Sequence, residues 1–118
     1  MNDRLMTCIL ELPQISSVVE GVTVSESTSL LLPCSCTGSP VPTITWYLPN
    51  GWVVSSASNY QIQVNGSLSI SLVDCNRDHG SFRCLCENIV GSDSIDIPVS
   101  VKCKYWLAIN VYIVRENV

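Results

Sequence analysis

The chain has 118 residues, which is enough for one domain with its own hydrophobic core and too few for two. Only 14% of the residues are charged and 47% are hydrophobic, a composition that excludes an intrinsically disordered chain. The net charge of −4 provides no basic surface, so we expect no nucleic-acid partner and no attraction to an anionic membrane.

Seven cysteines in a chain of this length indicate an oxidising compartment, because a reducing cytosol keeps thiols free. The odd number leaves at least one thiol unpaired within a monomer. The apolar run from Leu5 to Leu10 is too short for a signal-peptide core, and the uncharged run from Tyr105 to Val114 is too short to span a bilayer. The cysteines therefore indicate secretion although no signal peptide is visible, and we expect a piece of a longer protein or an imperfect gene prediction.

Apolar and polar residues alternate along most of the chain, and a period of two is typical of β-strands. Turn residues recur roughly every 8–12 positions, which favours a sandwich or a barrel of short strands. No stretch has a sustained helical period. The expected strands are residues 13–15, 22–24, 29–36, 43–48, 52–55, 59–64, 67–73, 81–88 and 93–101.

Asn65-Gly66 lies between two of these strands and predicts a type I′ hairpin, in which both central residues have positive φ. The same residues begin Asn65-Gly66-Ser67, which is an acceptor triplet for N-glycosylation on an expected exposed turn. Asn65 is therefore a candidate glycosylation site, provided that the chain enters the secretory route.

Cys34 and Cys84 lie on expected strands with Trp46 between them, and this order of Cys, Trp and Cys is the signature of an immunoglobulin-like sandwich. The run from Cys34 to Trp46 resembles the B-to-C stretch of I-set domains of the immunoglobulin superfamily. The run from Asp78 to Gly91 resembles their E–F corner, F strand and F–G turn.

The expected hairpin at 65–70 is similar to the D–E hairpin of the same family, so the resemblance extends over about residues 13–101. It implies an all-β immunoglobulin-like β-sandwich, two antiparallel sheets with Greek-key topology. We expect an N-terminal extension at residues 1–12, the I-set domain at 13–102 and an apolar C-terminal tail at 103–118.

The resemblance implies a disulfide between Cys34 and Cys84 that joins the two sheets, with the ring of Trp46 packed against it. The other expected core residues are Leu32, Leu68, Ile70 and Phe82.

Two residues depart from the family pattern. Phe82 replaces the tyrosine that is usual at the E–F corner, so the hydroxyl-to-backbone bond of that corner is missing. Asp78 meets a basic residue before the D strand in many relatives, whereas residues 56–60 contain no cation.

Four further cysteines have alternative roles. Cys36 and Cys86 each lie two residues beyond a core cysteine, so both face inward. They form either a second inter-sheet disulfide or two buried free thiols. Cys75 and Cys103 belong to one pole of the sandwich and offer a third bridge, while Cys8 precedes the domain and is the natural odd thiol. Zinc binding by the two Cys-x-Cys pairs is less favoured, because structural zinc sites usually space their cysteines further apart.

No catalytic group of residues is evident. The single histidine, His79, is expected in a tight turn without an acidic pair or a phosphate-binding loop nearby. Cys84 is the nearby nucleophile, and the resemblance assigns it to a disulfide. We therefore expect no enzyme and no cofactor.

The resemblance implies protein–protein recognition or spacing in an adhesion molecule, a receptor ectodomain or a matrix protein. The expected partners are a protein ligand or a homophilic partner, plus neighbouring domains of a longer chain. Trp52 is a candidate contact residue unless it packs over the sheet edge. Two alternatives are an intracellular structural module of a giant muscle-type protein and a soluble truncated decoy isoform.

Overall fold

The computed structural model describes residues 9–17, 19–57 and 59–104, so Cys8 and most of the expected tail lie outside the described residues. The secondary structure of the described part is entirely β. None of these residues forms a helix with the length and hydropathy needed to cross a membrane. The strands are β1 (Glu11–Ile15), β2 (Val22–Ser25), β3 (Leu30–Leu32), β4 (Cys36–Ser39), β5 (Thr43–Tyr47), β6 (Tyr60–Ile62), β7 (Leu68–Ile70), β8 (Gly80–Glu87) and β9 (Ser92–Lys102).

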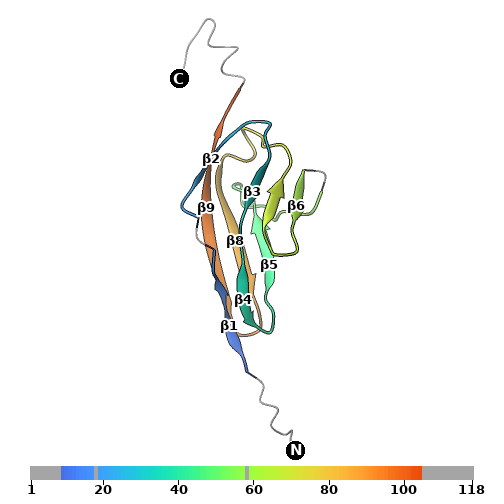
Figure 1. The fold of residues 1–118 in the computed structure, drawn as a ribbon, viewed down its shortest axis with the longest axis vertical. Helices are drawn as coiled ribbons and strands as arrows, with labels where there is room; N and C mark the ends of the chain where they lie inside the picture. Colours follow the sequence, from blue (N-terminus) through green and yellow to red (C-terminus); the bar gives the residue numbers. More distant parts are fainter. Residues whose placement is uncertain (1–8, 18, 58, 105–118) are drawn as a thin grey trace, which may run out of the picture.

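The strands form a sandwich of two facing layers (Figure 1). One layer is a four-stranded sheet in the order β2-β9-β8-β5, in which only the β2–β9 pair is parallel. The other layer consists of the sheet β3-β7-β6 and the two-stranded ribbon β1-β4. The all-β prediction is therefore confirmed.

The alternating sequence of β8 explains how this strand divides the core from solvent. Phe82, Cys84 and Cys86 are fully buried, whereas Arg83 and Glu87 on the opposite face are exposed. Successive side chains of a strand point to opposite sides, so the apolar set faces the second layer. The outward set faces solvent.

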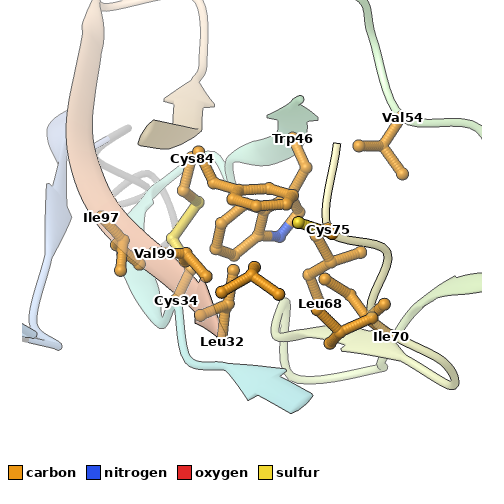
Figure 2. Packing of buried hydrophobic residues seen from close by; sticks show 13 residues of the cluster. Leu32, Cys34, Trp46, Val54, Leu68, Ile70, Cys75, Cys84, Ile97 and Val99 are labelled. Carbon is orange, nitrogen blue, oxygen red and sulfur yellow. A yellow bond between two sulfur atoms is a disulfide. The ribbon is translucent and has the colours of Figure 1, made fainter. Parts of the chain in front are cut away.

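Trp46 occupies the centre of the core, and its ring lies beside the Cys34–Cys84 disulfide (Figure 2). The indole nitrogen Nε1 donates a hydrogen bond to the carbonyl oxygen of Gly66 at 2.7 Å, so this buried polar group is satisfied. The four other expected core residues are also fully buried: Leu32, Leu68, Ile70 and Phe82.

The expected strand at 29–36 is wrong in one respect, because the structure divides it into β3 and β4. Pro33 has no amide hydrogen and ends the pairing with β7. The chain then pairs with β1 instead, and the amide of Ser16 donates to the carbonyl oxygen of Ser35 at 2.9 Å. The inward direction of Cys34 is kept across the break, which is why the alternation did not reveal it.

The predicted hairpin is present between β6 and β7, but its type is not I′. Gly66 has φ of +97°, whereas Asn65 does not have positive φ. The amide of Gly66 donates a hydrogen bond to the carbonyl oxygen of Gln63 at 2.9 Å. The amide of Gln63 donates to the carbonyl oxygen of Ser67 at 2.7 Å. These bonds define a three-residue loop that ends on glycine. A Cβ at Gly66 would overlap the Ile44 side chain, so glycine is required there for space as well as for φ.

The expected strand at 52–55 is reduced to one bridge, between Val53 and Tyr47. Two hydrogen bonds support it: Leu48 N to Trp52 O at 2.8 Å and Val54 N to Trp46 O at 2.9 Å. On the N-terminal side of this bridge, β5 is the edge strand of its sheet.

Candidate interaction surfaces

Three disulfides fix the frame on which the surfaces are built. Cys34 is joined to Cys84 with Cα atoms 6.6 Å apart, and Cys36 is joined to Cys86 with Cα atoms 6.7 Å apart. Both bridges connect the β3–β4 segment to β8. The third bridge joins Cys75 to Cys103 at the other end of the sandwich, with Cα atoms 5.4 Å apart. These separations lie within the range of protein disulfides.

The structure therefore places Cys36 and Cys86 in a disulfide rather than as two thiols. The described residues contain no group of three or more His, Cys, Asp and Glu side chains arranged to hold a metal ion. The sulfurs that the zinc alternative needs are committed to S–S bonds.

Asn88 holds together three segments at the pole where β1 begins. Its Nδ2 donates to the carbonyl oxygens of Glu11 at 2.9 Å and Pro40 at 3.0 Å. Its Oδ1 accepts from the amides of Val90 at 2.8 Å and Gly91 at 3.2 Å. Both donors and both acceptor sites of the amide are therefore used. The sequence around Asn88 carries no signal for the bonds to Glu11 and Pro40, which belong to distant segments.

An apolar surface, here called the N-terminal cap, surrounds this clamp. Its residues come from the start of β1, the β4–β5 loop and the β8–β9 turn, and all are exposed or nearly so: Ile9, Leu10, Leu12, Val41, Ile89 and Val90. Leu12 approaches Gly91 so closely that a Cβ there would lie 2.8 Å from Leu12 Cδ2. A group of exposed apolar residues at one end of a soluble domain is a candidate contact site.

The outward face of the four-stranded sheet carries a second surface. Tyr47 on β5, Arg83 on β8 and Asp96 on β9 lie side by side in the register of the sheet. Arg83 Nε donates to Asp96 Oδ1 at 2.8 Å, and Arg83 Nη2 donates to Oδ2 at 3.3 Å. The hydrogen bonds from Arg83 hold the pKa of Asp96 below its ordinary value. Both side chains are more than half exposed, so this pair is available for recognition and adds little to stability.

A shallow hollow of about 390 Å³ opens beside this ion pair. Its walls combine apolar and aromatic groups with one positive and one negative charge. The lining residues are Tyr47, Leu48, Pro49, Gly51, Ser81, Arg83, Leu85 and Asp96. The hollow can accept an apolar side chain of a partner while the ion pair fixes polar groups at its rim.

Trp52 lies just beyond this face and is 73% exposed, with Val53 beside it 58% exposed. It therefore does not pack over the sheet edge. Large exposed aromatic side chains are favoured at protein interfaces, and Trp52 remains a candidate contact residue.

The model of the immunoglobulin I-set domain matches residues 13–101. The chain belongs to the immunoglobulin I-set family. Human immunoglobulin superfamily member 10 is 34% identical over 104 residues, and hemicentin-2 of Mus musculus is 38% identical over 99 residues. These matches cover 84% and 80% of this chain but only 4% and 2% of the two relatives. Titin domain M7 superposes with a TM-score of 0.73 at 26% identity, over 80% of this chain and 97% of that structure.

This I-set domain replaces the tyrosine corner with a different group of residues. Asp78 is fully buried and accepts hydrogen bonds from the Tyr60 hydroxyl and, at 2.7 Å, from the Asp74 amide. Arg77 Nη2 lies 3.0 Å from Asp78 Oδ2, and its guanidinium stacks over the Tyr60 ring at 5.1 Å. Burial, followed by the hydrogen bond to Asp78, raises the pKa of Tyr60 well above its ordinary value. The cation that residues 56–60 lack is thus supplied by Arg77.

His79 also has a structural partner in this I-set domain, although the sequence gave no sign of it. Its Nδ1 accepts a hydrogen bond from the backbone amide of Val101 at 3.0 Å. The bond holds the C-terminal end of β9 against the E–F corner, close to the Cys75–Cys103 bridge. Its role in the described structure is therefore to position backbone.

Proposed function

We propose that this I-set domain is an extracellular module of an adhesion molecule, a receptor or a matrix protein that acts by protein–protein contact. The domain takes up residues 13–102 in this proposal, between an N-terminal extension and an apolar tail. The six cysteines joined in pairs support an oxidising location, since a reducing compartment leaves such thiols free.

The observation that carries the proposal is the outward face of β5, β8 and β9. Most outward side chains of this sheet are small and polar, whereas the hollow brings together Tyr47, Leu85 and the exposed Arg83–Asp96 pair. Aromatic and arginine side chains supply much of the energy at interfaces, and the ion pair supplies direction. The chemistry suits a peptide or protein surface with one apolar side chain.

The same face suits a homophilic partner. A two-fold interface places the same patch on both copies, so each charge must meet its opposite. Arg83 and Asp96 lie side by side and meet this condition when one copy is rotated onto the other. The N-terminal cap supports a second contact, with a neighbouring module of a longer chain, which is the spacing part of the proposed role.

Self-association of the secreted chain tests the recognition face. We expect a concentration-dependent increase of mass in sedimentation, and we expect Leu85→Arg to abolish it. Thr23→Arg is the matched control, because Thr23 is exposed on β2 of the same sheet and outside the hollow. Association that survives Leu85→Arg, or that Thr23→Arg removes equally, would contradict a contact through the hollow.

Thiol alkylation of the native protein tests the location. We expect the six paired cysteines to resist alkylation until a reductant and a denaturant are both present. Rapid alkylation of these cysteines in protein taken from its own tissue would contradict an extracellular role and favour the intracellular alternative.

A further inference from the structure

The Asn65-Gly66-Ser67 triplet belongs to neither of the surfaces described above. We propose that Asn65 carries an N-linked oligosaccharide and that this sugar is attached before the β6–β7 hairpin closes. The proposal rests on the proposed extracellular function, because the sugar donor is met on the secretory route.

The folded turn is compatible with a sugar on Asn65. The side chain is exposed, and its Oδ1 accepts a hydrogen bond from the Ser67 amide at 3.0 Å. Within the described part of the chain, Nδ2 has no hydrogen-bond partner. Substitution on Nδ2 keeps Oδ1 and one N–H, so the glycosylated side chain can make the same turn.

The folded turn is, in contrast, a poor substrate for the attachment reaction. The acceptor triplet is defined by the hydroxyl of its third residue, so the transferase has to reach that hydroxyl. Ser67 is only 5% exposed, and its carbonyl oxygen accepts the Gln63 amide at 2.7 Å. The Gly66 carbonyl is held by Trp46 Nε1. These bonds close the turn onto the core, so attachment has to precede them.

The reaction is a glycosyl transfer from an oligosaccharide linked to a lipid pyrophosphate. The Nδ2 atom of Asn65 attacks the anomeric carbon and forms the new C–N bond. The bond between that carbon and the pyrophosphate oxygen breaks, the lipid pyrophosphate leaves, and a base of the transferase takes the proton lost from Nδ2. No oxidant or reductant is required.

The position of Asn65 leaves the proposed recognition face open. The turn rests against the inward-facing Ile44 side chain and the Cys34 carbonyl, on the flank between β5 and β6 (Figure 1). Tyr47 and Leu85 point outward from the other side of the four-stranded sheet. A sugar on this flank would cover the open edge of β5 without filling the hollow, and such cover prevents pairing with strands of other chains.

Intact mass measurement tests occupancy. The full chain is produced in mammalian cells behind a cleavable secretion leader and measured before and after treatment with peptide N-glycosidase. We expect a loss of one oligosaccharide mass with conversion of Asn65 to aspartate, retention of the sugar in Ser67→Thr and its absence in Asn65→Gln. An unmodified Asn65 in both wild type and Ser67→Thr would overturn the proposal.

The order of events needs a second variant. Gly66→Ala keeps the acceptor triplet but cannot close the turn, because its Cβ would overlap Ile44 and lie 2.5 Å from the Cys34 carbonyl oxygen. We expect its occupancy to equal or exceed that of wild type, whether or not it folds. Folded unglycosylated wild type incubated with microsomal transferase should stay unmodified, while its reduced and denatured form accepts the sugar. Equal modification of both forms would contradict attachment before closure.

The thiols of the same preparations separate this proposal from the proposed function. Paired cysteines with an empty Asn65 would overturn the glycosylation and leave the extracellular module standing. An occupied Asn65 with free Cys34 and Cys84 thiols would support the glycosylation and contradict the disulfide-bonded extracellular module.

Discussion

The two poles of the sandwich are held together by different chemistry. At the pole where β1 begins, one neutral side chain, Asn88, joins three segments through four hydrogen bonds to backbone groups. At the opposite pole the buried carboxylate of Asp78 accepts hydrogen bonds from a hydroxyl and a backbone amide and pairs with a guanidinium. Within the described residues, exposed apolar side chains gather at the first pole, whereas the group at the second pole is built on a buried charge.

The E–F corner of this domain is held together without the usual tyrosine hydroxyl. Phe82 keeps the apolar part of the corner in the core, and Tyr60 provides a hydroxyl from a different strand. The two inter-sheet disulfides lie between the poles, and variants of these groups separate the contributions of the middle and of each end.

Removal of both inter-sheet disulfides is expected to have the largest effect. With Cys34, Cys36, Cys84 and Cys86 all changed to alanine, the unfolded chain regains the freedom of a 50-residue loop, worth about 4 kcal/mol in the chain-entropy model. Changing only Cys36 and Cys86 leaves the other bridge to close nearly the same loop, so we expect a loss of about 1 kcal/mol. Urea unfolding measures both. If the loss in the four-cysteine variant were only twice the loss in the Cys36, Cys86 variant, the two bridges would contribute equally and independently, which would contradict a shared loop.

Asp78→Ala is expected to lower the free energy of unfolding by about 3 kcal/mol, because the variant leaves the Tyr60 hydroxyl and the Asp74 amide without their acceptor. Asp96→Ala is the matched control, since Asp96 also pairs with an arginine but is exposed. We expect a much smaller loss for the control in the same urea titration. Equal losses would show that burial does not set the importance of these carboxylates.

Asn88→Ala is expected to cost about 2 kcal/mol, less than Asp78→Ala, because its partners are exposed backbone groups that water can replace. Amide hydrogen exchange should accelerate at Val90 and Gly91 and stay unchanged at Asp74. Asn88→Asp keeps the two acceptor bonds and loses the donors, so its loss should be intermediate. Faster exchange at both poles would contradict their independence.

Tyr60 gives the smallest expected effect and a dependence on pH. Its pKa in the folded protein is raised above the unfolded value of 10.0, so the folded state disfavours the phenolate. The resulting stability is fully present below pH 10 and is lost as the pH rises further. Thermal unfolding should therefore shift to lower temperature above pH 10 in wild type, and less so in Tyr60→Phe. An identical alkaline shift in both would show that Tyr60 is not responsible.

Alternation predicted the strands whose burial follows it without interruption, such as β8 and β9. It could not predict the break after β3, because Cys34 keeps its inward direction while the partner strand changes from β7 to β1. The turn at Asn65 was placed correctly but given the wrong type, since Gly66 is fixed by Ile44 and Trp46 from another strand.

The functional surfaces depend on contacts between distant segments, and these were less predictable. Asn88 bonds to Glu11, 77 positions away, and the sequence near Asn88 carries no trace of that contact. The hollow requires the register of three strands, which composition does not encode. Local pattern predicted that Cys36 and Cys86 face inward, because two residues along a strand return to the same face, but it left a disulfide and two free thiols as alternatives.

The connectivity of the core cysteines tests the central claim most directly, since both the sandwich and its proposed location depend on Cys34–Cys84. In a Cys36→Ala, Cys86→Ala variant, trypsin places Cys34 in the peptide of residues 5–77 and Cys84 in that of residues 84–102. Mass spectrometry of the secreted, unreduced protein should find these peptides linked, with fragmentation assigning the link to Cys34 and Cys84. Separate peptides with both cysteines free to alkylate would contradict the account.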